Sequence, residues 1–361
     1  MKLEDLGWAE PFVSALAELP IASPTPGRVT SAHRNHYTLL TVRAGQPVDI
    51  LVRLGGRLRH LVDDAFDLPT VGDWVAARIP DDGEGVIEAV LPRRSALVRS
   101  RPAGGGQPQL IAANLDSVFV VCSLNEDFSP RRLERYLSLV WESGARPVIL
   151  LSKLDLCRDL PHHLDRTREV AVGVPVHALS SLTAEGVDEL TPYLAPGQAV
   201  ALVGSSGVGK STLVNALLGD KRVETGAIRT SDGRGRHTTS RRELHVLPSG
   251  ALLIDTPGMR EVGLWSDSDQ GLRSAFDDVQ ALADACRFHD CGHQGEPGCE
   301  IAAAVERGQL TEARFRSFQK LQRELAFLHR QQDDRARREH DQRMKRVWKV
   351  RSRAFRQNPK R

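Results

Sequence analysis

The chain has 361 residues and a formal net charge of +3, with 40% hydrophobic and 26% charged residues. This length predicts two or three domains, and the composition is that of a soluble globular protein. The N-terminus has no basic patch followed by an apolar core, and no run approaches the roughly 18 apolar residues of a membrane span. We therefore expect a cytoplasmic protein without a signal peptide.

The net charge conceals a basic C-terminal tail. Residues 330–361 contain 13 Lys and Arg against 4 Asp and Glu, a net charge of +9, so the rest of the chain carries −6. A basic tail on a mildly acidic body indicates a polyanionic partner, and the alternative is a solvated helix.

The first 98 residues predict a helix followed by a small β domain. Residues 1–27 have the pattern of a short amphipathic helix and a linker rich in Pro and Ser. Residues 28–98 contain short strands separated by Gly, Pro and Asp turns. This pattern predicts a closed β-barrel, an OB-fold or an SH3-like barrel, which either binds oligonucleotides or serves only as structure. The predicted strands are Tyr37–Val42, Asp49–Arg53, Asp73–Ala77 and Gly85–Val90.

Residues 99–110, with three successive glycines, predict a second linker. Strands and helices then alternate through residues 111–270, which predicts a doubly wound α/β domain. Residues 271–361 read as a helical domain with the basic tail. The predicted strands of the α/β domain are 117–122, 147–151, 175–179, 199–203, 244–247 and 251–254, and its helices are 130–142, 187–194 and 209–218.

A phosphate-binding loop follows the apolar strand Ala199–Val203 and runs into a helix. Its glycines let successive N–H groups turn toward one anion, and the helix N-terminus adds positive potential. Lys210 is placed to reach the β- and γ-phosphates, and Ser211 to offer its hydroxyl to Mg²⁺. The loop reads Gly204-Ser205-Ser206-Gly207-Val208-Gly209-Lys210-Ser211-Thr212.

Asp255-Thr256-Pro257-Gly258 follows the strand Ala251–Ile254. An Asp at the carboxyl end of a strand can hold Mg²⁺ through water, and the N–H of Gly258 can sense the γ-phosphate. Met259 comes next, and its apolar side chain cannot orient the attacking water as a Gln would. Another group, or a partner, must therefore position the water.

The polar, basic segment 229–242 lies where the first switch is expected. Thr238 or Thr239 can supply the hydroxyl that closes on Mg²⁺. His237 is the candidate catalytic residue that orients water, and the alternative is an exposed or RNA-contacting histidine.

Ser152-Lys153-Leu154-Asp155 follows a predicted strand and matches a guanine-reading loop. The Asp155 carboxylate can accept two hydrogen bonds from guanine, and the Lys153 stem can lie along the base plane. Ser180 and Ser181, after the next strand, can offer N–H groups to the guanine carbonyl. Ser152 stands where such loops usually have the Asn that braces the phosphate loop, so its presence predicts weaker nucleotide affinity.

The base reader precedes the phosphate loop in the chain, whereas an ordinary GTPase has them in the opposite order. The sequence therefore predicts a circularly permuted GTPase domain. The switch end of such a domain is joined directly to the C-terminal domain, which gives nucleotide state a means to move that domain.

Three of the five cysteines lie close together, in the pattern Cys286-x4-Cys291-x-His293-x5-Cys299. Three thiolates and one imidazole are the ligands of a closed tetrahedral zinc site, which is structural because no coordination position stays open. His289 is an alternative imidazole ligand. Cys122 and Cys157 are expected to be plain thiols.

These motifs together resemble those of the RsgA (YjeQ/YloQ) family of GTPases that depend on the small ribosomal subunit. The resemblance covers nearly the entire chain. It is carried by the phosphate loop, the cysteine cluster and four further segments: Val71-Gly72-Asp73-Trp74-Val75, Asn125-Glu126-Asp127-Phe128, Gly235-Arg236-His237-Thr238-Thr239 and Asp255-Thr256-Pro257-Gly258.

The resemblance implies an N-terminal OB-fold, a permuted GTPase domain and a C-terminal domain with one structural zinc ion on Cys286, Cys291, His293 and Cys299. It also implies that the protein binds GTP with Mg²⁺, assists late maturation of the small (30S) ribosomal subunit and binds its 16S rRNA. We expect a monomer. GTP hydrolysis would be stimulated by that particle. The alternative is a non-catalytic RNA-binding scaffold with GTP as a structural ligand; a transport or redox role for the cysteines is a third reading.

Overall fold

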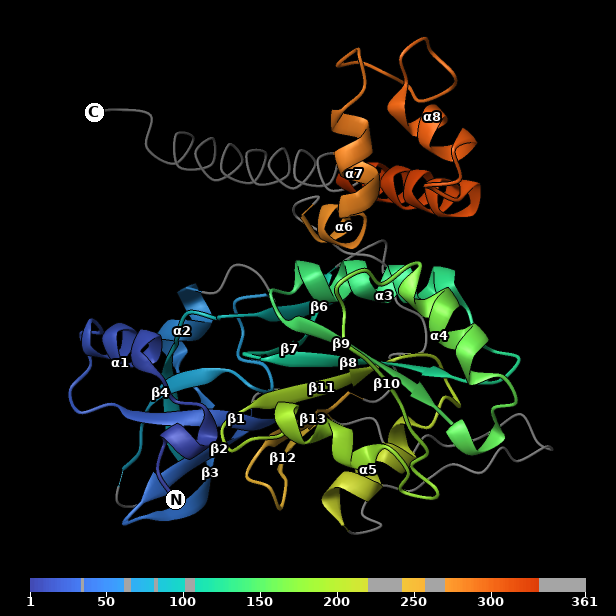
Figure 1. Ribbon diagram of the computed structural model, residues 1–361. Helices are drawn as coiled ribbons and strands as arrows, with labels where there is room; N and C mark the ends of the chain where they lie inside the picture. Colours follow the sequence, from blue (N-terminus) through green and yellow to red (C-terminus); the bar gives the residue numbers. More distant parts are fainter. Residues whose placement is uncertain are drawn as a thin grey trace, which may run out of the picture.

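The computed structural model describes residues 1–33, 36–61, 66–80, 84–100, 108–219, 242–256 and 270–330. A barrel, a central sheet covered by helices and a C-terminal group of helices follow one another along the chain (Figure 1). No helix in these ranges has the length and apolar character of a membrane span.

The barrel has five strands in the order β1-β2-β3-β5-β4 and is closed by pairing of β1 with β4. This order, with β3 parallel to β5 and a helix between β3 and β4, is the topology of an OB-fold and confirms the predicted barrel. Its core is a cluster of alternate strand residues that includes Val29, Tyr37 and Ile87. The elements are β1 (Thr25–His33), β2 (His36–Arg43), β3 (Gln46–Leu54), α2 (Gly56–Leu61), β4 (Trp74–Arg78) and β5 (Gly85–Val90).

The N-terminal helix and the two linkers differ from the prediction. Gly7, with φ of 82°, divides the expected helix into η1 (Glu4–Leu6) and α1 (Glu10–Ala17). Strand β1 begins at Thr25, inside the first predicted linker, because pairing across the barrel outweighs the local preference of Pro26 and Gly27. The second linker is partly a hairpin of β6 (Ala96–Ser100) and β7 (Pro108–Ala113).

The central sheet has the order β10-β9-β8-β11-β13-β12, and all its pairings are parallel except that of the hairpin β12–β13. Alternate residues of a strand enter different cores: Val118 and Val120 pack on one face, and Phe119 and Val121 on the other. Burial on both faces explains the continuous apolar runs of the sequence. The strands are β8 (Ser117–Ser123), β9 (Arg146–Ser152), β10 (Val176–Ala178), β11 (Ala199–Val203), β12 (Glu243–Val246) and β13 (Leu252–Asp255).

Helices cover both faces of this sheet, as predicted for a doubly wound fold. Helix α3 (Pro130–Glu142) has the predicted bounds and lies on one face, while α5 (Lys210–Leu218) lies on the other (Figure 1). Ser129 is the N-cap of α3 but makes no side-chain capping hydrogen bond. The helix predicted over 187–194 is the 3-10 helix η3 (Val187–Tyr193), since Pro192 interrupts α-helical bonding. Helix α4 (Leu160–Arg168) was not predicted.

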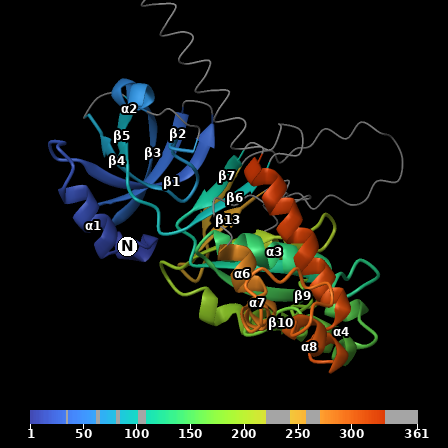
Figure 2. The same cartoon turned by 90° about the horizontal axis from the view of Figure 1, so that it is seen from above.

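The C-terminal helices pack over α3, on the side of the sheet away from α5 (Figures 1 and 2). They are α6 (Gln270–Ala275), α7 (Asp277–Asp284), α8 (Glu300–Glu306) and a helix over residues 312–330. Leu272, Phe276 and Phe318 belong to the same apolar core as the inner face of α3, so the C-terminal domain shares a core with the α/β domain.

Candidate nucleotide and metal sites

Four predicted site segments lie at one edge of the central sheet. Strands β9, β10, β11 and β13 are parallel to one another or to a common neighbour, so the loops after them meet at the carboxyl edge. Ser152–Asp155, Ser180–Ser181, the phosphate loop and Asp255 follow these four strands in turn. The fold therefore brings together the predicted base reader, the phosphate loop and the predicted magnesium carboxylate.

The phosphate loop turns sharply between β11 and α5. Gly204, Gly207 and Gly209 have φ values of 151°, 78° and 99°, and a Cβ on Gly204 would lie 2.4 Å from the Val121 carbonyl oxygen. Glycine is therefore required at that first position. The Lys210 ammonium donates to the carbonyls of Gly204 and Ser205, at 2.7 and 2.6 Å. Its charged end thus lies over the loop, as a phosphate ligand must.

Ser152 braces the phosphate loop from β9. Its buried hydroxyl donates to the Val208 carbonyl at 2.6 Å. The sequence predicted a weakened brace because Asn is replaced, but the shorter Ser side chain makes a direct hydrogen bond to the loop. The phosphate loop is therefore braced at this contact, and the lack of a brace no longer gives a reason to expect weaker nucleotide affinity.

The base-reading segment is held by the strand beside it. Lys153 is in the left-handed conformation, with φ of 62°, and starts the 3-10 helix η2 (Leu154–Leu156) that carries Asp155. The Ser180 hydroxyl donates to Asp155 Oδ1 at 2.6 Å, while the Ser180 N–H donates to the Glu185 carbonyl at 2.9 Å. Ser180 therefore orients Asp155, and its amide is already bonded within the protein, contrary to the predicted contact with guanine.

Two of the predicted magnesium ligands, Ser211 and Asp255, lie within the described residues. Ser211 is exposed in the first turn of α5. Burial raises the pKa of Asp255, while the neighbouring His245 and Lys210 oppose that rise. The buried Thr256 hydroxyl donates to the Leu202 carbonyl at 2.9 Å and ties the end of β13 to β11. A divalent cation would add to the positive charge that favours an ionised Asp255.

Several predicted residues lie outside the described residues: His237, Thr238, Thr239, Gly258 and the neighbouring Met259. The segment 229–241 and the tail after residue 330 lie outside them as well.

The sequence analysis gave no role to Arg132, which contacts the phosphate loop from α3. Its guanidinium donates to the Ser205 hydroxyl at 2.9 Å and to the Asp127 carboxylate at 2.8 Å. Asp127 belongs to a segment, Asn125–Phe128, that was noted for its resemblance to a family motif. That motif was the available signal, but the contact with Ser205 spans 73 positions and leaves no local pattern.

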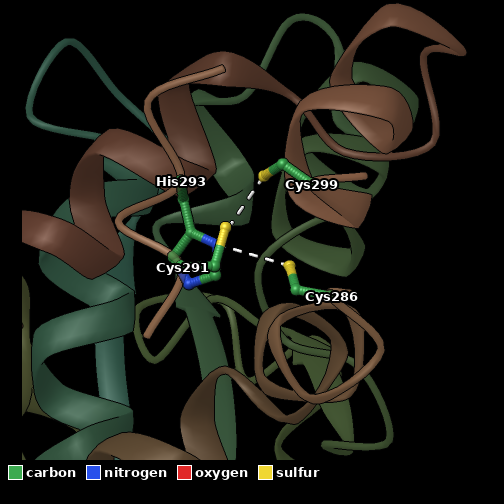
Figure 3. A group of neighbouring side chains, drawn as sticks. All are labelled: Cys286, Cys291, His293 and Cys299. Carbon is green, nitrogen blue, oxygen red and sulfur yellow. Dashed lines mark hydrogen bonds between the residues drawn. The ribbon is translucent and has the colours of Figure 1, made fainter. Parts of the chain in front are cut away.

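The predicted metal ligands Cys286, Cys291, His293 and Cys299 converge between α7 and α8 (Figure 3). His293 Nδ1 lies 3.5 Å from Cys286 Sγ and 3.7 Å from Cys299 Sγ, and all the ligand atoms lie within 4.8 Å of one another. Ligands bound tetrahedrally at about 2.3 Å for sulfur and 2.0–2.1 Å for nitrogen are roughly 3.5–3.8 Å apart. The cluster therefore fits one zinc ion, and His289 is not a member of it.

Backbone N–H groups donate to two of the cysteine sulfurs. The N–H groups of Glu300 and Ala302, in the first turn of α8, donate to the sulfurs of Cys286 and Cys299, each at 3.4 Å. Desolvation opposes ionisation of Cys286, but backbone hydrogen bonds outweigh it and lower the pKa of that thiol. His293 has φ of 55°, an uncommon conformation for a residue with a side chain. Such positions concentrate at functional sites.

The phosphate loop, its brace and a base-reading loop on an earlier strand define a circularly permuted P-loop GTPase. The family model described as "RsgA GTPase" matches residues 90–265, and one described as "50S ribosome-binding GTPase" matches residues 199–346. The chain belongs to the RsgA GTPase family and is a GTP hydrolase.

Its relatives match most of its length. A protein of Lactiplantibacillus plantarum called small ribosomal subunit biogenesis GTPase RsgA 2 is 46% identical, over 83% of each chain. The protein of Opitutus terrae called small ribosomal subunit biogenesis GTPase RsgA is 42% identical, over 96% of each. Among solved structures, YjeQ from Thermotoga maritima is similar with a TM-score of 0.63 and 28% identity, over 84% of this chain and 99% of that one.

Proposed function

We propose that this GTPase binds the small (30S) ribosomal subunit, contacts its 16S rRNA and assists late maturation of the particle, which stimulates GTP hydrolysis. The observation that carries the proposal is the match to relatives named for small-subunit biogenesis over 83% and 96% of this chain. Because those matches include the barrel and the C-terminal domain, they support a shared function of the whole chain and not only of its GTPase core.

The nucleotide would lie along the carboxyl edge of the central sheet. Asp155 would accept hydrogen bonds from guanine, with Lys153 and Leu154 beside the base and Ser181 offering its amide. The N–H groups of the phosphate loop, from Gly204 to Thr212, would surround the phosphates. The hydrogen bond from Ser180 to Asp155 supports this assignment, because it presents the carboxylate in a fixed orientation.

Hydrolysis needs a cation and an oriented water. Mg²⁺, when bound, neutralises charge on the β- and γ-phosphates, and Ser211, Asp255 and Thr238 or Thr239 would hold it. Gly258 would sense the γ-phosphate. His237 would orient the attacking water, since Met259 cannot. His237→Ala should then lower subunit-stimulated turnover with little change in GTP affinity. Unchanged turnover on the particle would mean that the ribosome supplies the group.

Ribosomal RNA would be bound by basic surfaces. Arg43, Arg57 and Arg59 are exposed on the barrel, and guanidinium groups suit phosphate contact. The basic segments 229–242 and 330–361 would add to this charge. Binding should weaken steeply with salt, because each neutralised phosphate releases counterions. A protein that acts on ribosomal particles works in the cytoplasm, and we propose that it does so as a monomer.

The cysteine cluster would hold one structural Zn²⁺. The donor set of three thiols and one imidazole, and its ligand spacing, support that metal. The ion would fix the loops between α7 and α8 without taking part in hydrolysis.

The proposal is tested by phosphate release under multiple turnover, alone and with purified 30S or 50S subunits at equal concentration. We expect strong stimulation by 30S particles only, and cosedimentation with 30S particles in the presence of a non-hydrolysable GTP analogue. Stimulation by 50S particles alone would contradict the proposal and favour the function named by the second family model. Turnover unaffected by either particle would contradict any ribosomal role.

The base reader has its own test. Asp155→Asn should weaken GTP binding and favour xanthosine triphosphate, because the substitution reverses the donor and acceptor pattern facing the base. GTP affinity equal to that of the wild type would place the base reader elsewhere.

A further inference from the structure

Arg132 lies in the first turn of α3, directly beside the phosphate loop. A positive charge there is unfavourable for the helix, because the N-terminus of a helix dipole is itself positive. No acidic residue occupies that turn to compensate. Arg131 shares this turn, so what distinguishes Arg132 is the set of contacts that it makes.

The guanidinium is fixed by the loop that precedes α3. Arg132 donates to both carboxylate oxygens of Asp127, at 2.8 and 3.3 Å, and to the Asp127 carbonyl at 2.8 Å. Asn125 fixes Asp127 in turn: its side-chain oxygen accepts from the Asp127 N–H at 3.1 Å and from the Ser123 hydroxyl at 2.8 Å. The planar guanidinium thus reaches the loop in one orientation, with its side chain 35% exposed.

Ser205 connects this guanidinium to the phosphate-binding lysine. Its hydroxyl accepts from Arg132 at 2.9 Å, and its carbonyl accepts from the Lys210 ammonium at 2.6 Å. A shift of Ser205 would therefore displace the group that faces the β- and γ-phosphates. Ser205 therefore touches both cations.

We infer that Arg132 is a positioning residue of the GTPase site. Through Ser205 it holds the phosphate loop, and with it Lys210, in the geometry that the nucleotide phosphates require. The inference rests on the proposed nucleotide site at the carboxyl edge of the sheet. It gives a role to the Asn125–Phe128 segment, which orients the guanidinium.

The test compares Arg132→Ala and Ser205→Ala with Arg131→Ala, a matched control on the same helix whose side chain is exposed. We expect Arg132→Ala to lower kcat/KM for GTP by roughly tenfold to hundredfold, as small misplacements of catalytic groups do. Affinity for a non-hydrolysable GTP analogue should fall more than affinity for GDP, because Lys210 faces the γ-phosphate. Arg131→Ala should leave both properties unchanged.

Two further variants separate positioning from a general loss of structure. Ser205→Ala removes the hydroxyl that bonds both Arg132 and Tyr136, so it should lose at least as much as Arg132→Ala. The double variant should be no worse than Ser205→Ala alone. Arg132→Lys should recover little, since an ammonium cannot bond Asp127 and Ser205 in the same fork. The inference would be overturned if the losses in kcat/KM of the two single variants multiply in the double variant. It would also be overturned if Arg132→Ala has the same kcat/KM as Arg131→Ala. A wild type that binds no guanine nucleotide would instead overturn the proposed site itself.

Discussion

The GTPase domain is joined to another domain on each side, and the two junctions are built from different interactions. On the barrel side the sheet continues, because β12 pairs with β1 through Ser31 and Glu243. On the C-terminal side no strand crosses among the described residues, and helix α6 lies against α3 instead. The first junction combines a shared sheet and an apolar core with one buried arginine, while the second combines an apolar core with a buried ion cluster.

Aromatic packing closes the barrel junction. The rings of Trp8 and Phe12 lie 4.7 and 6.0 Å from that of Trp74, in the apolar core shared with the α/β domain. Arg28 is fully buried beside them and donates to the carbonyls of Leu6 and Asn114. Burial lowers the pKa of Arg28 to about 10, so it keeps its charge at neutral pH.

A buried ion cluster closes the C-terminal junction. Arg314, from the helix over residues 312–330, contacts Glu134 of α3 at 3.0 Å and Asp278 of α7 at 2.6 Å. The side chains of Arg314 and Glu134 are only 5% and 2% exposed. The Arg314 guanidinium also lies 4.6 Å from the centre of the Phe276 ring. Ser317 donates its hydroxyl to the same Glu134 carboxylate.

This difference predicts which junction separates more readily. Apolar surface gains nothing from water when it is exposed, whereas buried charges recover their hydration when two domains part. The C-terminal junction buries a cluster of charges between α3, α7 and the helix over residues 312–330, whereas the barrel junction buries Arg28 and also holds a strand pair. We therefore expect the C-terminal domain to open while the barrel stays attached. The following predictions test that expectation.

Loss of the metal should have the largest effect on stability, and it should affect the C-terminal domain but not the barrel. Structural zinc contributes about 10–16 kcal/mol in small zinc-finger peptides. We expect chelation, or Cys299→Ala, to remove hydrogen-exchange protection from α7 and α8, with the barrel strands unchanged. Metal analysis should return about one zinc per chain. Cys157→Ala is the matched control, because that thiol lies outside the cluster. An equal loss of hydrogen-exchange protection in the barrel strands would contradict the expectation that the two junctions open independently.

Arg314→Ala should destabilise docking of the C-terminal domain by about 3–5 kcal/mol, because it leaves the Glu134 carboxylate buried without its cation. Hydrogen exchange of α6 and α7 measures the effect. Arg314→Ala combined with Glu134→Gln should recover part of the loss, since residue 134 then no longer carries a buried charge. A double variant as unstable as the single one would show that lost packing, and not charge, dominates.

The loss of stability caused by Arg314→Ala should depend on pH. Burial raises the pKa of Glu134 above its ordinary 4.5, although hydrogen bonding from Ser317 and the charge of Arg314 oppose the rise. Removing Arg314 raises this pKa further. A group with a raised pKa loses its stabilising contribution as pH rises through that value. The deficit of Arg314→Ala against wild type should therefore be largest at neutral pH and shrink on acidification, as thermal unfolding at several pH values would reveal. A constant deficit would argue against an ionised Glu134.

A pair of glycines allows the junctions to be compared directly. A Cβ on Gly72 would lie 2.2 Å from the Ala113 carbonyl oxygen, and one on Gly271 would lie 2.3 Å from that of Ser138. Gly72 also has φ of 92° and lies against the backbone of β7, so Gly72→Ala should cost roughly 2–5 kcal/mol. Gly271→Ala should cost about 1–3 kcal/mol, because α6 can move away from α3. Denaturant titration of both variants measures which substitution lowers the free energy of unfolding more. A larger loss for Gly271→Ala would reverse our comparison.

The partly exposed pair of Arg135 and Glu324 should matter least. Two hydrogen bonds of 2.8 and 2.7 Å join these side chains, which are 27% and 30% exposed. Ion pairs of this kind contribute about 0–1 kcal/mol. A double-mutant cycle with Arg135→Ala and Glu324→Ala should return a coupling energy in that range. A coupling energy as large as that of Arg314 and Glu134 would mean that the difference in solvent exposure does not determine how much each ion pair contributes.

The sequence by itself determined the features whose residues are close together in the chain. The phosphate loop, the cysteine cluster and helix α3 were predicted from spacing and apolar pattern, because their geometry is local. The central strands were predicted because burial on both faces requires continuous apolar runs. Strand β1 was missed, since its Pro26 and Gly27 have no local preference for a strand and only pairing with β4 places them there.

Only the tertiary structure decided which distant side chains support the site and the junctions. The hydrogen bonds Arg132–Ser205, Ser152–Val208 and Arg314–Glu134 join residues 73, 56 and 180 positions apart. Nothing local in the sequence encodes such pairs, because a long side chain has many rotamers and its partner is fixed only when the sheet and its helices have packed. The same reason explains why Ser152, expected to weaken the phosphate loop, is found to brace it.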